Sequence, residues 1–107
     1  MNKQRRIALK KIIESLRKFN IKTNGELSQE QIDELDTIKN DLEYVLSEEQ
    51  YSLDNIPENL QGSYRYQQSE AACDSIENAI EFISDAMDDD TEKNINEAID
   101  NVYDAMN

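Results

Sequence analysis

Carboxylates are the main side chains in this sequence that could perform chemistry: it has 24 Asp and Glu, no His and a single cysteine, Cys73. Without His, nucleophile pairs of the Ser-His-Asp or Cys-His type cannot form. A zinc site of Cys and His ligands is excluded for the same reason. Carboxylates alone could serve acid–base catalysis, but here they are scattered over predicted helix surfaces and form no recognisable site. We therefore expect neither an enzyme nor a bound cofactor.

The densest acidic group is the run of three aspartates at residues 88–90. A calcium-binding EF-hand loop that began there would have Lys93 where glycine is needed and Ile99 where a bidentate Glu is needed. We expect no metal site. The run is better suited to a helix break, with Asp90 or Thr91 as the N-cap of the next helix. A helix that runs straight through is the alternative, because apolar residues on both sides of the run keep one helical phase.

Apolar residues spaced three and four apart predict helices over residues of about 3–20, 28–51, 63–87 and 91–106. Thr23-Asn24-Gly25 is expected to end the first helix. Ser28 and Gln31 form a capping-box pattern that opens the second.

Residues 52–62 predict a structured corner, because Pro57 disfavours helix at the preceding residue. Leu53, Ile56 and Leu60 are expected to fix this corner against the helices. Ser63 is the predicted cap of the third helix.

Composition indicates a single all-α domain over residues 1–107. The chain has two Gly, one Pro and 37% hydrophobic residues, which suits helices around a thin core. We expect a three- or four-helix antiparallel bundle, with oligomerisation as one way to complete that core. Cys73 is expected to be a small buried hydrophobic residue. The sequence shows neither a transmembrane stretch nor a secretory signal, which favours a cytoplasmic location.

Charge divides the chain into two parts. Residues 1–22 carry eight cations and one acid, whereas the remaining residues carry 23 acids and three cations. The basic helix could pack on acidic helices of its own or a neighbouring copy, lie on anionic lipid, or contact nucleic acid phosphates. The acidic remainder would repel lipid headgroups and phosphates, so we expect no membrane and no direct nucleic acid partner. A homo-oligomer is expected instead, with the self-association residues Arg5, Arg6, Lys10, Lys11 and Arg17.

The predicted third helix combines a row of acids with an aromatic start. Its carboxylates at three-and-four spacing make a line of charge, and Tyr and Arg are residue types enriched at interface hot spots. Such a row either solubilises the protein or mimics nucleic acid in a partner's phosphate-binding groove. The candidate partner-binding residues are Tyr64, Arg65, Tyr66, Glu70, Asp74, Glu77, Glu81 and Asp85.

A resemblance supplies a biological setting. Residues 55–63 (Asn-Ile-Pro-Glu-Asn-Leu-Gln-Gly-Ser), Tyr66 and the run Glu70-Ala71-Ala72-Cys73-Asp74 resemble small uncharacterised acidic helical proteins encoded by phages and prophages of Gram-positive bacteria. The resemblance implies a phage protein in the host cytoplasm, where such proteins are often regulators or inhibitors of host defence, as anti-CRISPR proteins are. The expected function is therefore a non-catalytic module that binds and inhibits a host protein. The alternative is a self-assembling structural or adaptor protein, in which the basic helix docks on acidic helices of a neighbouring protomer.

Overall fold

The computed structural model describes residues 1–19 and 27–106. Its elements are α1 (Lys3–Lys18), α2 (Gln29–Asp54), the short 3-10 helix η1 (Glu58–Leu60), α3 (Tyr64–Ala86) and α4 (Thr91–Ala105). The described residues contain no strand, which confirms the all-α prediction. The predicted helix stop at Thr23-Asn24-Gly25 lies outside them.

Side-chain caps fix the starts of three helices. Asn2 accepts a hydrogen bond from the Arg5 backbone N–H, which begins α1. The predicted capping box is present, because Ser28 Oγ accepts from the Gln31 N–H while Gln31 Oε1 accepts from the Ser28 N–H. Ser63 caps α3 as predicted, through the Tyr66 N–H. Local sequence therefore determines where these helices begin.

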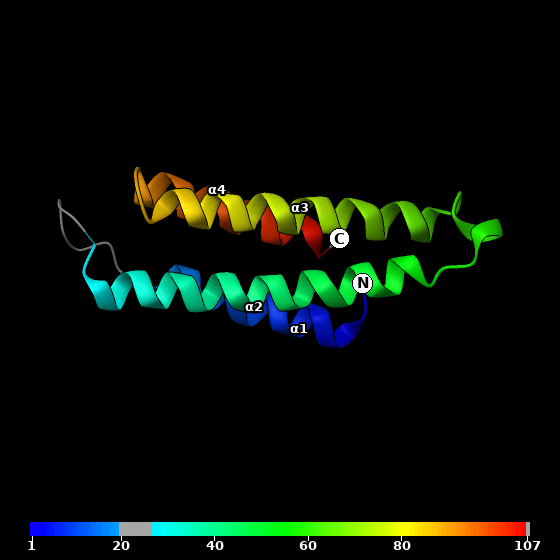
Figure 1. Ribbon diagram of the computed structural model, residues 1–107, viewed down its shortest axis with the longest axis horizontal. Coiled ribbons are helices and arrows are strands. Elements are labelled where there is room, and N and C mark those ends of the chain that lie inside the picture. Colours follow the sequence, from blue (N-terminus) through cyan, green and yellow to red (C-terminus); the bar gives the residue numbers. More distant parts are fainter. Residues whose placement is uncertain (20–26, 107) are drawn as a thin grey trace.

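The helices form a four-membered ring in which each runs antiparallel to the next (Figure 1). The principal contacts are α1 with α2, α2 with α3, α3 with α4, and α4 with α1, so α1 and α3 occupy opposite corners. Each helix contributes an apolar stripe to one shared core. The core residues that are completely buried are Leu9, Leu35, Leu42, Ile76, Ala79, Ile83, Ala86, Ala98, Val102 and Ala105.

The helix break predicted at residues 88–90 is confirmed. Asp90 is the N-cap residue of α4 and has φ 42° and ψ 51°, a left-handed conformation in which its side chain makes no capping hydrogen bond. Thr91 Oγ1 donates to the Ala86 carbonyl at 2.8 Å, and Asn94 Nδ2 donates to the Asp89 carbonyl at 2.8 Å. These bonds close a tight turn, so α4 can fold back along α3.

Helices α2 and α3 are longer than their neighbours and project past both α1 and α4 at one end (Figure 1). We call this end, residues 50–68, the hairpin tip. The hydrophobic core contains none of its residues. Leu53 and Ile56 are half-buried, but Leu60 is 50% exposed. The expectation that Leu60 fixes the corner against the helices is therefore wrong, because α1 begins and α4 ends before either helix can cover this residue.

Candidate functional site

The predicted acidic row lies on α3 where it can meet a partner. Glu70, Asp74, Glu77, Glu81 and Asp85 are all exposed. Successive helical residues are about 100° apart, which places these five acids opposite the buried stripe of α3. They run along the helix for about 22 Å at 1.5 Å per residue.

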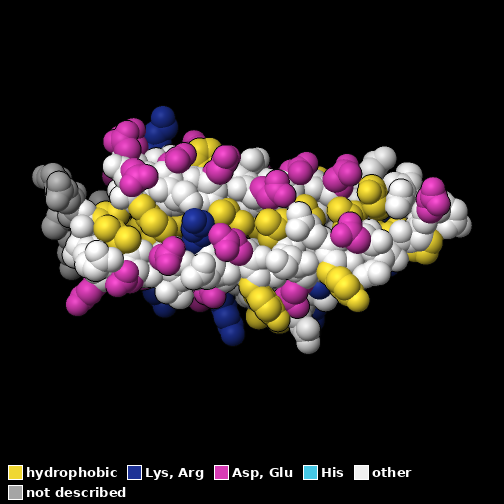
Figure 2. Space-filling view, viewed as in Figure 1, with side chains coloured by type: hydrophobic (Ala, Val, Ile, Leu, Met, Phe, Trp, Pro, Cys, Tyr) yellow, Lys and Arg dark blue, Asp and Glu magenta, His cyan; other side chains and the backbone are white. Residues whose placement is uncertain are grey.

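Helix α4 adds a second acidic row beside the first. Glu97, Asp100 and Asp104 are exposed and lie opposite the buried residues of their own helix. Acidic side chains accordingly gather along the edge formed by α3 and α4 (Figure 2). We call these eight carboxylates the acidic face. In the part of the chain that the structure describes, none of them forms an ion pair, and Glu77 accepts one hydrogen bond, from Gln50 Nε2 at 3.3 Å.

The aromatic start of α3 does not belong to the same surface. Tyr64 is 75% exposed, whereas Tyr66 is half-buried. Arg65 lies about 140° around the helix from Glu70, so it points to the inner side of the hairpin tip. There it lines two adjoining hollows. The structure therefore divides the candidate residues into an acidic face and a separate group at the tip.

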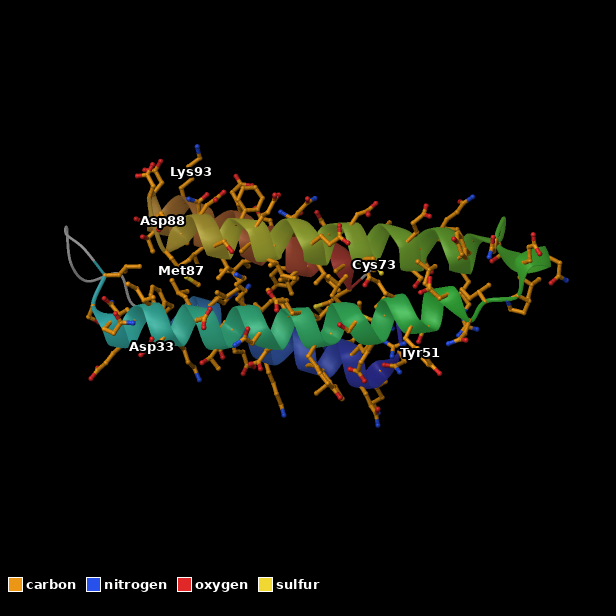
Figure 3. All side chains as sticks on the ribbon, viewed as in Figure 1. Asp33, Tyr51, Cys73, Met87, Asp88 and Lys93 are labelled. Carbon is orange, nitrogen blue, oxygen red and sulfur yellow. The ribbon has the colours of Figure 1, made fainter. Side chains whose placement is uncertain are left out.

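Sequence reasoning missed part of the tip. Tyr51 is 73% exposed near the end of α2 (Figure 3). With Leu60 and Arg65 it lines a hollow of about 630 Å³. The sequence contained a partial indication that Tyr51 belongs to the tip, because Tyr51 lies one residue before the predicted corner. What the sequence could not show is that α1 and α4 stop short of these side chains.

A buried charge, the carboxylate of Glu49, was also missed. Glu49 is 1% exposed, and its Oε2 accepts from Arg5 Nε at 2.9 Å. Its Oε1 accepts from Ser69 Oγ at 3.1 Å and lies 3.6 Å from the Met1 amino group. Arg5 also donates to Ser52 Oγ at 3.0 Å. This cluster joins the start of α1 to α2 and α3.

The cluster around Glu49 explains how the first turn of α1 is stabilised. Lys3, Arg5 and Arg6 oppose the positive end of the α1 helix dipole, so the first turn should fray unless an acid covers it. Glu49 supplies that acid from α2. The basic helix thus meets an acidic helix within one protomer at this point.

The five predicted self-association residues fall into two groups. Arg5 and Arg17 have partners within the chain: Arg17 donates to the Tyr103 hydroxyl, and its guanidinium lies 5.3 Å from that ring's centroid. Arg6, Lys10 and Lys11 are exposed and form no ion pair with residues 1–19 or 27–106. These three are the ones available to another molecule.

Cys73 is buried on the side of α3 that faces α2, as the sequence predicts (Figure 3). Burial raises the pKa of its thiol from 9.0 to about 11, and the nearby carboxylates, Glu49 first among them, add to that increase. A thiol with this pKa is almost fully protonated at neutral pH. Cys73 is therefore a poor nucleophile.

Other kinds of site find no support in the described residues. They contain no group of three or more Cys, Asp or Glu side chains placed to hold a metal ion. No helix among them is both long and apolar enough to cross a membrane. Comparisons with protein-family models, curated proteins and solved structures give no significant match.

Proposed function

We propose that this protein is a non-catalytic binding module whose acidic face engages a basic surface of a partner protein. The observation that carries the proposal is the orientation of the five α3 carboxylates. They point away from the core, and no cation among the described residues pairs with them. Eight unpaired carboxylates on two neighbouring helices give a strong local negative potential, which favours association with a cationic groove.

The charge spacing favours a partner that binds nucleic acid. Eight carboxylates within about 22 Å correspond to roughly one negative charge per 3 Å. Duplex DNA carries one per about 1.7 Å of axis, and a single strand one per about 3.4 Å. The acidic face thus slightly exceeds the linear charge density of one strand and stays below that of the duplex. In the phage setting that the resemblance implies, the target would be a host defence protein, which the module inhibits by occupying its nucleic acid groove.

A capture experiment with matched charge variants tests this proposal. Glu77→Gln, Glu81→Gln and Asp85→Asn together remove three charges from the acidic face. The control triple variant removes three from α2: Asp36→Asn, Asp41→Asn and Glu43→Gln. We expect host proteins captured by the wild type and the control to be lost with the acidic-face variant, and a single-stranded oligonucleotide to compete for them. Equal capture by both variants would refute the proposal.

Self-assembly is a second candidate, favoured by the positions of α1 and α3. We call the exposed cations of α1 between Lys3 and Lys18 the basic stripe. Because α1 and α3 lie at opposite corners of the bundle, the basic stripe does not reach the α3 acids of the same copy. The stripe from Lys3 to Lys18 is about 22 Å long, the same as the α3 row. Docking the stripe of one copy on the acidic face of the next is a heterologous contact, which forms either closed rings or open stacks.

Two complementary variants distinguish self-assembly from partner binding. Lys10→Gln with Lys11→Gln disables the basic stripe, and Glu77→Gln with Glu81→Gln disables the acidic face. If copies stack, each variant alone sediments as a monomer, while a mixture forms a one-to-one dimer that dissociates at about 0.5 M salt. Wild-type protein that stays monomeric at low salt eliminates this candidate.

A further inference from the structure

The hairpin tip carries an apolar groove that the core leaves uncovered. The groove has a volume of about 630 Å³, and its apolar walls come from Tyr51, Ile56, Pro57 and Leu60. No acidic residue lines it. Tyr51 and Leu60 are 73% and 50% exposed, so the free protein keeps these two apolar side chains in contact with water at this end. Exposed apolar surface of this kind, bordered by polar groups, is typical of an interaction site.

A second hollow, of about 460 Å³, adjoins this groove and shares Ser52, Ile56 and Arg65 with it. We call it the arginine hollow, because Arg5 and Arg6 line it together with Arg65. Among the described residues that line it, Glu49 is the only acid.

The arginine hollow has an unbalanced positive charge. Glu49 is already paired with Arg5, which also donates to Ser52. Arg6 and Arg65 are exposed and form no ion pair with any residue in the described part of the chain. Two free guanidinium groups therefore face one hollow in a chain whose net charge is −13. Guanidinium groups bind carboxylates through two parallel hydrogen bonds, which suits them to this environment.

We propose that the groove and the arginine hollow together bind a short acidic peptide segment of a partner protein. A carboxylate of the segment pairs with Arg6 and Arg65, while a neighbouring large apolar side chain lies in the groove against Ile56 and Leu60. The shared wall brings the two parts into contact, so one ligand can fill both. The groove alone is within the size range of pockets that hold small ligands.

This site is separate from the acidic face. Arg65 and Glu70 point to opposite sides of α3, and the two surfaces select ligands of opposite charge. Charges more than about 8 Å apart are largely screened at physiological ionic strength, so most of the acidic face acts weakly on a segment at the tip. Glu70, about 7.5 Å along α3 from Arg65, is the member of the α3 row that lies nearest to it. Binding of an acidic segment at the tip therefore does not depend on binding of a partner at the acidic face.

Selection from a displayed library of random twelve-residue peptides tests the proposal. We expect peptides that combine Asp or Glu with an adjacent Leu, Ile, Phe or Trp to be enriched on the wild-type protein. The best peptide is then synthesised and titrated. A charged hydrogen bond is worth about 1.5–3 kcal/mol, so Arg6→Gln with Arg65→Gln should weaken binding by roughly 10- to 100-fold or more. Leu60→Ser should also weaken it, by removing an apolar wall.

Lys3→Gln with Lys10→Gln is the matched control, because it removes two positive charges from α1 outside the arginine hollow. It should leave the affinity within about twofold, since exposed charges away from the ligand contribute little. All substituted arginines and lysines are exposed or outside the core, so thermal melts should show folded variants. Enrichment of basic peptides, no enrichment, or equal weakening by the control would each overturn the proposal. So would a wild-type dimer that Arg6→Gln with Arg65→Gln dissociates, because the site would then hold a second copy.

Discussion

Arg5 Nε on α1 lies 2.9 Å from Glu49 Oε2 on α2, and the Glu49 carboxylate is 1% exposed. Ser69 of α3 donates to the other oxygen of the same carboxylate. Three helices therefore meet at one buried charge. Apolar stripes leave helix register loosely specified, whereas a buried ion pair permits only the register in which both charges are satisfied. We infer that this cluster sets how far α1 extends along α2, and thereby leaves the hairpin tip uncovered.

Removing the Glu49 carboxylate should strongly destabilise the fold. Glu49→Ala leaves Arg5 partly buried without a counter-charge and deprives Ser69 of its acceptor. We expect the free energy of unfolding, measured by urea denaturation, to fall by about 3 kcal/mol. Glu43→Ala, on the exposed side of the same helix, should change it by less than about 0.5 kcal/mol. Similar losses for the two variants would show that the buried pair contributes no more than a surface charge.

Cys73 should react slowly with thiol reagents. With its pKa raised to about 11, the thiolate fraction at pH 8 falls about 100-fold below that of an ordinary thiol, before burial limits access further. The rate of reaction with Ellman's reagent in native buffer should therefore be at least that much lower than in denaturant. A native rate within tenfold of the denatured rate would contradict the raised pKa.

The raised pKa of Cys73 should make the free energy of unfolding fall at alkaline pH. Because the folded pKa lies above the ordinary value of 9.0, Cys73 contributes stability below pH 9 that is lost as the pH rises toward 11. The loss should reach about 2–3 kcal/mol, since one pKa unit equals about 1.36 kcal/mol. Cys73→Ala should show a smaller decline over this range. Parallel declines for wild type and variant would assign the effect to tyrosines and lysines instead.

Asp90 offers a stabilising substitution. Its φ of 42° is unfavourable for a residue with a side chain, and that side chain makes no capping hydrogen bond. Asp90→Gly should raise the free energy of unfolding by about 0.5–1 kcal/mol, and Asp90→Ala should lower it. Asp90→Asn is the control for charge, because asparagine tolerates the left-handed conformation. If glycine and alanine had equal effects on the thermal midpoint, the turn would not be strained.

Helix α1 should be integral to the fold. Leu9 is completely buried, so Leu9→Ala should cost about 2–5 kcal/mol, whereas Ile7→Ala on the exposed side should cost less than about 1 kcal/mol. Deletion of residues 1–22 should abolish cooperative unfolding, because it uncovers the core between α2 and α4. A deleted chain that melts at an unchanged temperature would show that the remaining helices suffice.

The sequence determined the local structure of this protein. Apolar residues three and four apart set the four helices, and Ser28, Gln31 and Ser63 set two of their starts, because caps and helical faces depend on residues within a few positions of one another. The break at residues 88–90 and the burial of Cys73 followed from the same short-range information. The acidic row of α3 was also readable, since its spacing alone places it opposite the buried stripe.

The tertiary structure decided which residues act together. Glu49 looks like any other helix acid until Arg5, 44 positions earlier in the chain, is packed against it. Sequence position groups Arg65 with the acids that follow it, yet in the structure Arg65 lines one hollow together with Arg6, on the other side of α3 from those acids. The apolar groove contains no residue of α1 or α4, whereas the arginine hollow lies between the start of α1 and the helices α2 and α3. Spacing fixes the direction of a side chain on its own helix, but helix register, which long-range packing sets, determines what it meets there.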